Sequence, residues 1–376
     1  MTRLHLAVAV AAVGLSACTT EAATPPAATA KGRAGTGTTT KPPKPSNLAS
    51  DEEVRFIPTF GTKTTDGWSV PIEAWVFEPE DDGPVRAATA KLVEEAMETQ
   101  VDEATSKRIA NNLRPFMVDN ERGKRLTIQA GSTAARVCTS GSDGRCSGTM
   151  ALPEGSPASL EVSVVLDPDD HRRFAGRVFL LPDEGVSVLS DIDDTIKITE
   201  VHDKKRLIEN TFARPARACP GVAALYRRWA SQGAAFHYVS NSPLPLLGAI
   251  ERLIDDAGYP AGSLELKPFR WTDGSFLDLL AAPEDHKQDV ITTLIERFEH
   301  RRFVLVGDTG ERDPEIYAAL LRSHGDQIDK VYLRDTGSMS GAALEARLGR
   351  VFEGLPRASW TVFEDASEIH DELPGS

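Results

Sequence analysis

The chain has 376 residues, of which 40% are hydrophobic and 26% are charged, and these values are typical of a globular protein long enough for two domains. Its formal net charge is −14, so a general nucleic-acid-binding surface is not expected. The same acidity disfavours electrostatic adsorption to anionic lipid. We therefore expect any membrane attachment to come from an anchor rather than from a basic surface.

The first residues have the pattern of a secretory signal. A short basic start precedes an apolar run over 6–15, which is too short to span a bilayer. The sequence Leu15-Ser-Ala-Cys18 resembles the lipobox of bacterial lipoproteins. This resemblance implies a signal peptide over 1–18, acylation of Cys18, and a membrane-anchored, extracytoplasmic location in the cell envelope. Ordinary secretion with cleavage after Ala17 is the alternative.

Residues 19–50 are polar and rich in proline, and they carry too little apolar surface to fold alone, so we predict a disordered tether. Residues 51–184 then alternate apolar and polar side chains, as half-buried strands do. We predict a β-rich, sandwich-like domain with a helical insert. The predicted strands cover 54–60, 68–77, 126–129, 134–138, 160–166 and 176–181, and the predicted helices cover 84–100 and 103–113.

This N-terminal domain holds no catalytic pattern, and we expect Trp68 and Trp75 to be core residues rather than exposed contacts with lipid or a partner. Cys138 and Cys146 flank a turn rich in glycine and serine. Because an extracytoplasmic location permits disulfides, we predict that these two cysteines pair. Cys219 is predicted to be a buried free thiol, and the lack of a C-x-x-C pattern argues against a zinc site.

From residue 185 onward, apolar strands alternate with helical stretches, which predicts an α/β domain over 185–376 with helices on both faces of a parallel sheet. Ligands bind at the carboxyl ends of the strands in such sheets, so side chains that follow strands are candidate site residues. The predicted strands cover 186–189, 234–239, 264–266, 303–306, 331–333 and 360–363. The predicted helices cover 222–232, 245–257, 287–298, 314–323 and 342–352.

The first of these strands ends in a cluster of carboxylates, Asp191-Ile-Asp-Asp-Thr195. Like charges at such distances raise each other's pKa unless a cation lies between them. A turn that only caps the next helix is the alternative. The cluster resembles the DxDxT motif of the haloacid dehalogenase (HAD) superfamily of phosphohydrolases. Over 190–197 it resembles more closely the actin-patch (lipin-like) type of phosphatidate phosphatase, which implies a Rossmann-like HAD domain.

Later segments match further motifs of that superfamily in order. Ser240, at the end of the second strand, matches the hydroxyl that donates a hydrogen bond to the transferring phosphoryl group. Asn241 is the second candidate for that role and a candidate substrate contact, and a helix cap is the alternative function of this segment. Lys287 opens a helix, as the motif lysine does, and would neutralise charge during phosphoryl transfer, with His286 as a supporting group.

The segment Gly307-Asp308-Thr-Gly-Glu-Arg-Asp313 resembles the GDxxxxD motif, with Thr309 where we expect serine. Oxygen ligands without clustered His or Cys favour Mg²⁺. The resemblance implies that the carboxylates of Asp191 and Asp308 and the backbone carbonyl of Asp193 bind this metal. Asp313 would bind it through water or would cap the following helix.

In the mechanism that the resemblance implies, Asp191 attacks phosphorus and forms an aspartyl-phosphate. Asp193 protonates the leaving alkoxide and then takes a proton from the hydrolytic water. Thr195 orients Asp193 or its loop.

The spacings between the motifs leave no room for a large cap domain, which suits a bulky substrate presented at a membrane. Lys197 and Arg270 are candidate substrate contacts, and Trp271 is a candidate interfacial residue. The resemblance predicts hydrolysis of phosphatidate to diacylglycerol and phosphate. One alternative is a capless phosphatase that acts on phosphoprotein, envelope polymer or small esters, and another is a non-catalytic phosphatidate-binding module. The oligomeric state does not follow from the sequence.

Overall fold

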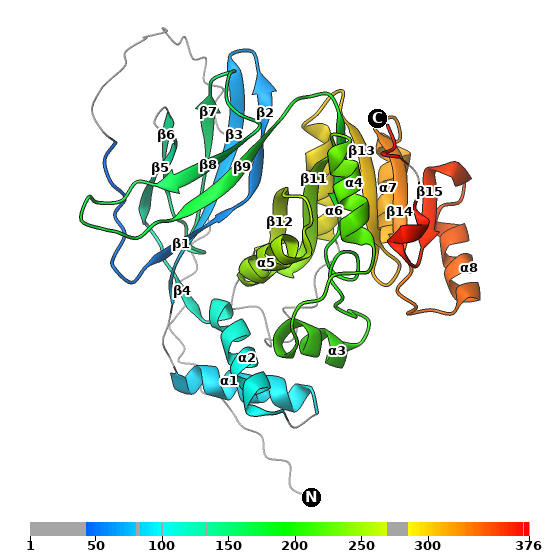
Figure 1. Cartoon of the computed structure of the whole chain (residues 1–376), viewed down its shortest axis with the longest axis horizontal. Helices are drawn as coiled ribbons and strands as arrows, with labels where there is room; N and C mark the ends of the chain where they lie inside the picture. The colour runs from blue at the N-terminus through cyan, green and yellow to red at the C-terminus, as the bar shows by residue number, and fades with distance from the viewer. Residues whose placement is uncertain are drawn as a thin grey trace, which may run out of the picture. The chain divides into compact units, whose positions relative to one another are not determined.

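The structure, a computed structural model, describes residues 43–79, 83–98, 101–131, 134–268, 285–370 and 372–375. Within these ranges the strands form two sheets, one in the N-terminal part of the chain and one in the C-terminal part (Figure 1). The predicted signal peptide with Cys18, and the predicted tether up to residue 42, lie outside the described residues.

The N-terminal sheet contains nine of the described strands, in the order β1-β3-β2-β9-β8-β5-β6, with β4 and β7 also paired to β3. The strands are β1 (Glu53–Ile57), β2 (Thr59–Thr64), β3 (Gly67–Pro79), β4 (Val118–Asn120), β5 (Arg125–Ala130), β6 (Ala134–Thr139), β7 (Arg145–Leu152), β8 (Ser159–Val164) and β9 (Ala175–Leu181). A sandwich has two sheets, whereas these strands are hydrogen-bonded in one. Val70 and Ile72 of β3 share a core cluster with Leu126 and Ile128 of β5, so different strands of this one sheet contribute to a common core.

Two details of this sheet differ from the prediction. The expected strand over 54–60 is divided at Pro58 into β1 and β2, because proline lacks the backbone N–H that a continuous ladder requires. Strands β4 and β7 are also absent from the prediction, and the buried side chains of β7 alternate with small polar or exposed ones. The predicted disulfide is confirmed: Cys138 on β6 bonds to Cys146 on β7 across a Cα–Cα distance of 5.7 Å.

The predicted helical insert is confirmed between β3 and β4 as α1 (Gly83–Ala96) and α2 (Glu103–Leu113). The Asp102 carboxylate caps α2 by accepting a hydrogen bond from the Thr105 amide at 2.8 Å. Ile109 and Leu113 are the buried residues of α2, and they belong to a cluster that includes Phe212 of the C-terminal part. The insert therefore packs on the α/β part of the chain.

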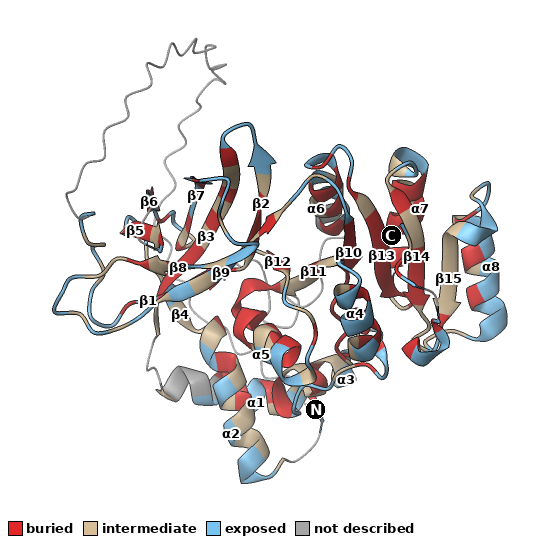
Figure 2. Cartoon of the chain, turned by 45° about the horizontal axis from the view of Figure 1, so that its top comes forward, coloured by how far each residue is buried: buried red, intermediate tan, exposed pale blue. Residues whose placement is uncertain are grey.

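The C-terminal sheet is parallel, in the order β12-β11-β10-β13-β14-β15 among the described strands. These strands are β10 (Val186–Ser190), β11 (Ala235–Pro243), β12 (Ser263–Lys267), β13 (Arg302–Asp308), β14 (Ile328–Arg334) and β15 (Trp360–Phe363). Strand β10 is buried along its whole length and lies at the centre of the sheet, beside the buried β13 (Figure 2). The predicted parallel sheet is thus confirmed.

Helices cover both faces of this sheet because successive side chains of a strand point to opposite faces. Val188 belongs to the cluster that contains α4 and α5, and Leu189 belongs to the cluster that contains α6, α7 and α8. The helices are α3 (Lys204–Ile208), α4 (Val222–Ser231), α5 (Leu247–Ala257), α6 (Asp285–Glu296), α7 (Asp313–His324) and α8 (Gly341–Val351). A π-helical turn, η2 (Glu209–Ala213), follows α3, and 3₁₀ turns occur at η1 (Arg114–Phe116), η3 (Leu244–Leu246), η5 (Arg357–Ser359) and η6 (Ala366–Glu368). None of the helices in the described ranges has the length and apolar character that crossing a bilayer requires.

The two sheets are joined by direct contacts. The Leu264 amide on β12 donates to the Pro58 carbonyl at 3.0 Å. The ring of Phe60 meets His237 edge-on with centroids 4.8 Å apart. Ile57 and Trp75 of the N-terminal sheet share a buried cluster with residues of α5. The regions predicted as two domains, 51–184 and 185–376, therefore have a common hydrophobic core, and Trp75 is a core residue as predicted.

Candidate active site

The candidate site lies at the carboxyl ends of the central strands. Strand β10 pairs in parallel with β11 on one side and β13 on the other. The residues that follow these strands, or end them, therefore lie at one edge of the sheet. The Asp191 amide extends the ladder by donating to the Val306 carbonyl at 2.8 Å. This pairing brings the predicted residues Asp191, Ser240 and Asp308 to the same edge.

Lys287 reaches this edge from the first turn of α6. Its ammonium donates to Oδ1 of Asp191 at 2.8 Å and also donates to Oδ1 of Asp313. The Lys287 side chain is 2% exposed. A cation this deeply buried is stable only when it is paired, and here it has two carboxylate partners.

The segment after β13 is held by backbone donors. Oδ1 of Asp308 accepts hydrogen bonds from the amides of Gly310 and Glu311, at 2.5 and 3.0 Å. The Asp308 amide in turn donates to Oδ2 of Asp313 at 3.2 Å. A Cβ at Gly307 would collide with that same Asp313 carboxylate, so the motif requires glycine there. Because α7 begins at Asp313 itself, and its side chain points into the site, the helix-cap alternative for Asp313 is wrong.

The residues at this edge suit a divalent cation. One carboxylate oxygen each from Asp191, Asp308 and Asp313 lie within 4.8 Å of one another. Oδ2 of Asp191 and Oδ2 of Asp308 are buried without a hydrogen-bond partner in the described residues. Three carboxylates face one ammonium, which leaves an excess charge of about −2 that a divalent ion would balance. An all-oxygen donor set favours a hard ion such as Mg²⁺.

Burial and mutual repulsion set the protonation of these groups. Burial raises the pKa of Asp191 well above its ordinary value, more than the Lys287 ammonium lowers it, and the Asp313 carboxylate raises it further. Burial, then Asp313, likewise raise the pKa of Asp308. Burial opposes the charge on Lys287, but Asp191 and Asp313 outweigh it and raise the Lys287 pKa. The site therefore favours positive charge between the carboxylates.

Asp193 is the centre of a second network. Its Oδ1 accepts from the Lys197 ammonium at 3.1 Å and from the Thr199 hydroxyl at 2.7 Å. Its Oδ2 accepts from the hydroxyls of Ser240 and Ser242, at 3.0 and 2.7 Å. Burial alone would raise the Asp193 pKa, but Lys197 and these hydroxyls outweigh burial and lower it to about 2. Asp193 is thus an ionised carboxylate that accepts hydrogen bonds from one ammonium and three hydroxyl groups.

One predicted contact of this loop, that of Thr195 with Asp193, is missing from the described residues, and the structure gives the partners of Lys197. The Thr195 hydroxyl is buried and has no hydrogen-bond partner among the described residues, so it does not orient Asp193. Thr199, which sequence analysis did not single out, contacts Asp193 instead. Lys197, predicted as a substrate contact, pairs with Asp193 and also lines an adjoining cavity. Oδ1 of Asn241 is likewise without a partner within the described ranges.

Arg270 and Trp271 lie outside the described residues, as does the side chain of His286.

Asp194, the neighbour of the catalytic candidates, organises the loop behind them. Its carboxylate accepts hydrogen bonds from the amides of Thr199, Glu200 and Val201 at 2.7–2.8 Å. The Asp194 backbone has a φ of 56°, a left-handed conformation that these bonds help to hold. Arg334 donates to the Asp194 carbonyl at 2.8 Å. Asp194 is therefore a scaffold for Asp193 rather than a reacting group.

Arg347 on α8 holds the other side of the site, and the spacing of the sequence gives no signal for it. Its guanidinium donates to the carbonyls of Thr309 and Glu311 at 2.7 and 2.6 Å. The same group forms a two-point contact with the Glu315 carboxylate on α7. Arg347 thus ties the turn that carries the Asp308 carboxylate to two helices.

Part of the chain that carries this site is similar to known proteins. Residues 186–335 match the family described as "Phosphatidate phosphatase APP1, catalytic domain". An uncharacterized protein of Schizosaccharomyces pombe is 30% identical over 171 residues, and phosphatidate phosphatase APP1 of Saccharomyces cerevisiae is 31% identical over 154 residues. These alignments cover 44% and 40% of the chain, but only 28% and 26% of the two relatives. The chain thus spans about a quarter of the length of the curated relatives that it matches.

A solved carbohydrate esterase structure aligns with 83% of the chain and 88% of its own length at 10% identity, with a TM-score of 0.16, which does not indicate a shared fold. The matched segment 186–335 begins at β10, and it contains Asp191, Asp193, Lys287 and Asp308. This part of the chain is therefore similar to the catalytic domains of the APP1 phosphatidate phosphatase family.

Proposed function

We propose that the protein is a HAD-type phosphatase that hydrolyses phosphatidate to diacylglycerol and inorganic phosphate. The observation that carries the proposal is the convergence of Asp191, Lys287, Asp308 and Asp193 at one sheet edge, in a segment that matches the family. A buried nucleophile beside a buried ammonium is the arrangement that phosphoryl transfer requires, because the reaction is promoted mainly by positioning and charge stabilisation.

In the proposed reaction, an oxygen of the Asp191 carboxylate attacks phosphorus while the bond to the diacylglycerol oxygen breaks. Asp193, when protonated, gives its proton to the departing alkoxide. Its ionised form, which the four donors favour, then takes a proton from the water that hydrolyses the aspartyl-phosphate. Lys287 stays between Asp191 and Asp313 throughout and offsets the charge of the incoming phosphate.

The unpartnered oxygens of Asp191 and Asp308 are proposed to hold Mg²⁺, with the Asp193 carbonyl and, through water, Asp313 as further ligands. When bound, the ion supplies neutralisation of the phosphate charge. The protein's own contribution is to aim two carboxylates at the same space. Burial raises the pKa values of both, and Lys287 opposes this increase at Asp191 and, together with the Glu311 amide, at Asp308.

The test is phosphate release from phosphatidate in mixed micelles by the full chain, with and without Mg²⁺. We expect Mg²⁺-dependent release that Asp191→Asn abolishes. The exposed Asp66→Asn is the matched control, because it makes the same change far from the site in the chain. Release from a soluble aryl phosphate but not from phosphatidate would retain the mechanism and exclude the lipid substrate. Phosphatidate binding without release by the unmodified chain would instead identify a binding module.

We further propose that acylation of Cys18 anchors the protein at the bacterial cell envelope, where a phospholipid substrate is at hand. The support is the lipobox-like sequence at 15–18. Radiolabelled palmitate should be incorporated into the unmodified chain and not into Cys18→Ser. Equal labelling of the two would refute the anchor.

A further inference from the structure

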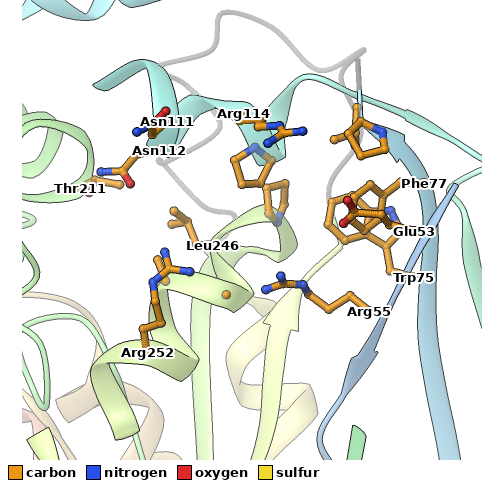
Figure 3. A pocket seen from close by; sticks show the side chains of 16 residues that line it. Glu53, Arg55, Trp75, Phe77, Asn111, Asn112, Arg114, Thr211, Leu246 and Arg252 are labelled. Carbon is orange, nitrogen blue, oxygen red and sulfur yellow. The ribbon is translucent and has the colours of Figure 1, made fainter. Parts of the chain in front are cut away.

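Two adjoining cavities lead away from the candidate active site, and the mechanism above uses neither of them. The first, of about 270 Å³, is lined by Lys197 and Ser242, which are two of the four side chains that contact the Asp193 carboxylate and which donate to its two different oxygens. The second, of about 280 Å³, extends to Trp75 and Phe77 on β3 (Figure 3). Their size approaches that of cavities that bind small organic ligands.

The cavities are contiguous, because five residues line both of them. These residues are Asn112, Thr211, Leu246, Ala249 and Arg252. In Figure 3, Asn112 lies on one side of the cavity. Leu246, in the turn before α5, and Arg252, on α5, lie on another side, opposite Trp75 and Phe77. A path therefore runs from the hydroxyl of Ser242 to the aromatic side chains of the N-terminal sheet.

The walls of this path are fixed by contacts between distant parts of the chain. The Asn112 amide on α2 donates to the Phe212 carbonyl at 2.9 Å, and Arg108 donates to the Ala213 carbonyl at 2.9 Å. The ring of Phe116 meets Phe212 at 5.7 Å. The helical insert of the N-terminal region thus forms one wall of a cavity that opens on the catalytic residues.

The lining combines polar and apolar side chains along the whole path. Near Asp193 its polar members are Lys197, Ser242 and Asn210. At the far end the apolar and aromatic members are Trp75, Phe77, Pro79, Pro115, Val118 and Pro245, and the polar or charged members are Glu53, Arg55, Asn111 and Arg114. Arg252 lies where the cavities meet, is exposed, and makes no hydrogen bond within the described ranges, so its guanidinium is available to an oxygen of a ligand.

We propose that this path binds the acylated glycerol part of the substrate, with the ester oxygens near Arg252 and an acyl chain against Trp75 and Phe77. This inference rests on the proposed function, since it assigns the leaving group of the same reaction. A leaving group with both ester oxygens and an acyl chain suits a lining that offers guanidinium groups beside aromatic rings. The N-terminal insert is then a specificity element of the catalytic site.

The experiment blocks the junction of the two cavities and compares two substrates. In the full chain, Ala249→Trp places an indole where the cavities meet. The smaller side chain of Ala249→Leu fills less of the same space. Ala249 is the third residue of α5, and the matched control is Ala224→Trp at the exposed third residue of α4, which lines none of the cavities described here. Thermal unfolding identifies a variant that fails to fold, in which case Ala249→Leu carries the test.

The substrates are dioctanoyl phosphatidate and glycerol 3-phosphate, which share the phosphate and the glycerol but not the acyl chains. We expect Ala249→Trp to lower kcat/KM on dioctanoyl phosphatidate about tenfold or more, because excluding two methylene groups from an apolar site costs about that factor. Hydrolysis of glycerol 3-phosphate should change less than about twofold, as should both activities of Ala224→Trp.

An equal loss on both substrates, or no loss on either, would overturn the inference and leave the proposed function standing. If the unmodified chain hydrolyses glycerol 3-phosphate but not phosphatidate, the proposed lipid substrate is wrong, and the assignment of an acyl chain to the path is wrong with it. No release from either substrate would reject the phosphatase activity itself.

Discussion

The ammonium of Lys287 lies 2.8 Å from the carboxylate of Asp191, and both side chains are 2% exposed. The same ammonium also pairs with Asp313, so one buried cation holds two buried carboxylates. Removing one partner of a buried ion pair leaves uncompensated charge, which costs about 3–5 kcal/mol.

Lys287→Met should therefore lower the free energy of unfolding by about 3–5 kcal/mol in the presence of a chelator. It should also reduce phosphate release at least roughly a hundredfold, because the charge of the phosphate is no longer offset. Urea unfolding and phosphate release measure the two effects. Lys204→Met, at an exposed position of α3, is the control. Equal stability of the two variants would show that the ion pair contributes little.

The hydroxyls of Ser240 and Ser242 donate to the same oxygen of Asp193. A hydrogen bond to a charged group contributes about 1.5–3 kcal/mol, so Ser242→Ala and Ser240→Ala should each lower kcat roughly 10- to 100-fold. The double variant should lose less than the product of the two factors, because both hydroxyls act on one atom. Ser231→Ala at the end of α4 is the control. A wild-type kcat in Ser242→Ala would show that, of these two serines, only Ser240 can contribute to the reaction.

Arg347 is a positioning residue, since it contacts the Asp308 turn and not the reacting atoms. Arg347→Leu should raise the Mg²⁺ concentration required for half-maximal activity about 10- to 100-fold, because groups that orient metal ligands contribute that much to affinity. Arg350→Leu, three residues further on the same helix and exposed, should leave it unchanged. A loss of thermal stability with an unaltered Mg²⁺ requirement would assign Arg347 a purely structural role.

Glu265 on β12 gives a pH-dependent stability away from the catalytic carboxylates. Burial, then the nearby Glu73 carboxylate, raise the pKa of Glu265 from 4.5 to about 7. The folded state therefore binds more protons than the unfolded state between these values, and stability is lost as the pH rises through this window. Glu265→Gln removes the effect.

We compare the free energy of unfolding of Glu265→Gln with that of the unmodified chain. The difference, variant minus unmodified chain, should increase by roughly 2–3 kcal/mol from pH 4 to pH 8. Urea unfolding at the two pH values measures this difference, with the exposed Glu353→Gln as control. A difference that is constant with pH would contradict the raised pKa.

The disulfide between Cys138 and Cys146 closes a short loop, with a sequence separation of 8. Replacing both cysteines by serine should lower the free energy of unfolding by about 2–3 kcal/mol through the entropy of the unfolded chain. Phosphate release should be unchanged, because the bond lies between β6 and β7 of the N-terminal sheet. A loss of activity in the folded variant would link this edge of the sheet to the site.

The catalytic candidates could be predicted because strand ends fix them. Asp191 follows an apolar strand and Asp308 ends one, so each carboxylate lies at the sheet edge independently of how the other elements pack. Arg347 could not be predicted, since its contact with Thr309 joins residues 38 apart through the packing of α8. The wall formed by Asn112 was equally hidden, because its contact with Phe212 spans 100 residues.

The roles of similar side chains were harder to assign than their positions. Thr195 and Thr199 both follow Asp193, and the motif predicts that Thr195 supports the Asp193 carboxylate. The chain instead reverses after Asp194, and this reversal turns the Thr199 hydroxyl toward the carboxylate. Ser240 and Ser242 likewise point to the same side of β11, because alternate residues of a strand do so. Periodicity could have suggested Ser242, whereas the reversal at Asp194 depends on its left-handed backbone.

The segment that matches the family ends at residue 335, whereas Arg347 on α8 follows it and α2 precedes it. Grafting 186–335 onto another protein would therefore transfer the proposed nucleophile, Lys287 and the proposed metal carboxylates. It would not transfer the guanidinium that ties the Asp308 turn or the helix that lines the path to β3. Recombination that separates this segment from β3, α2 or α8 should thus leave the reactive groups present and their supporting contacts missing.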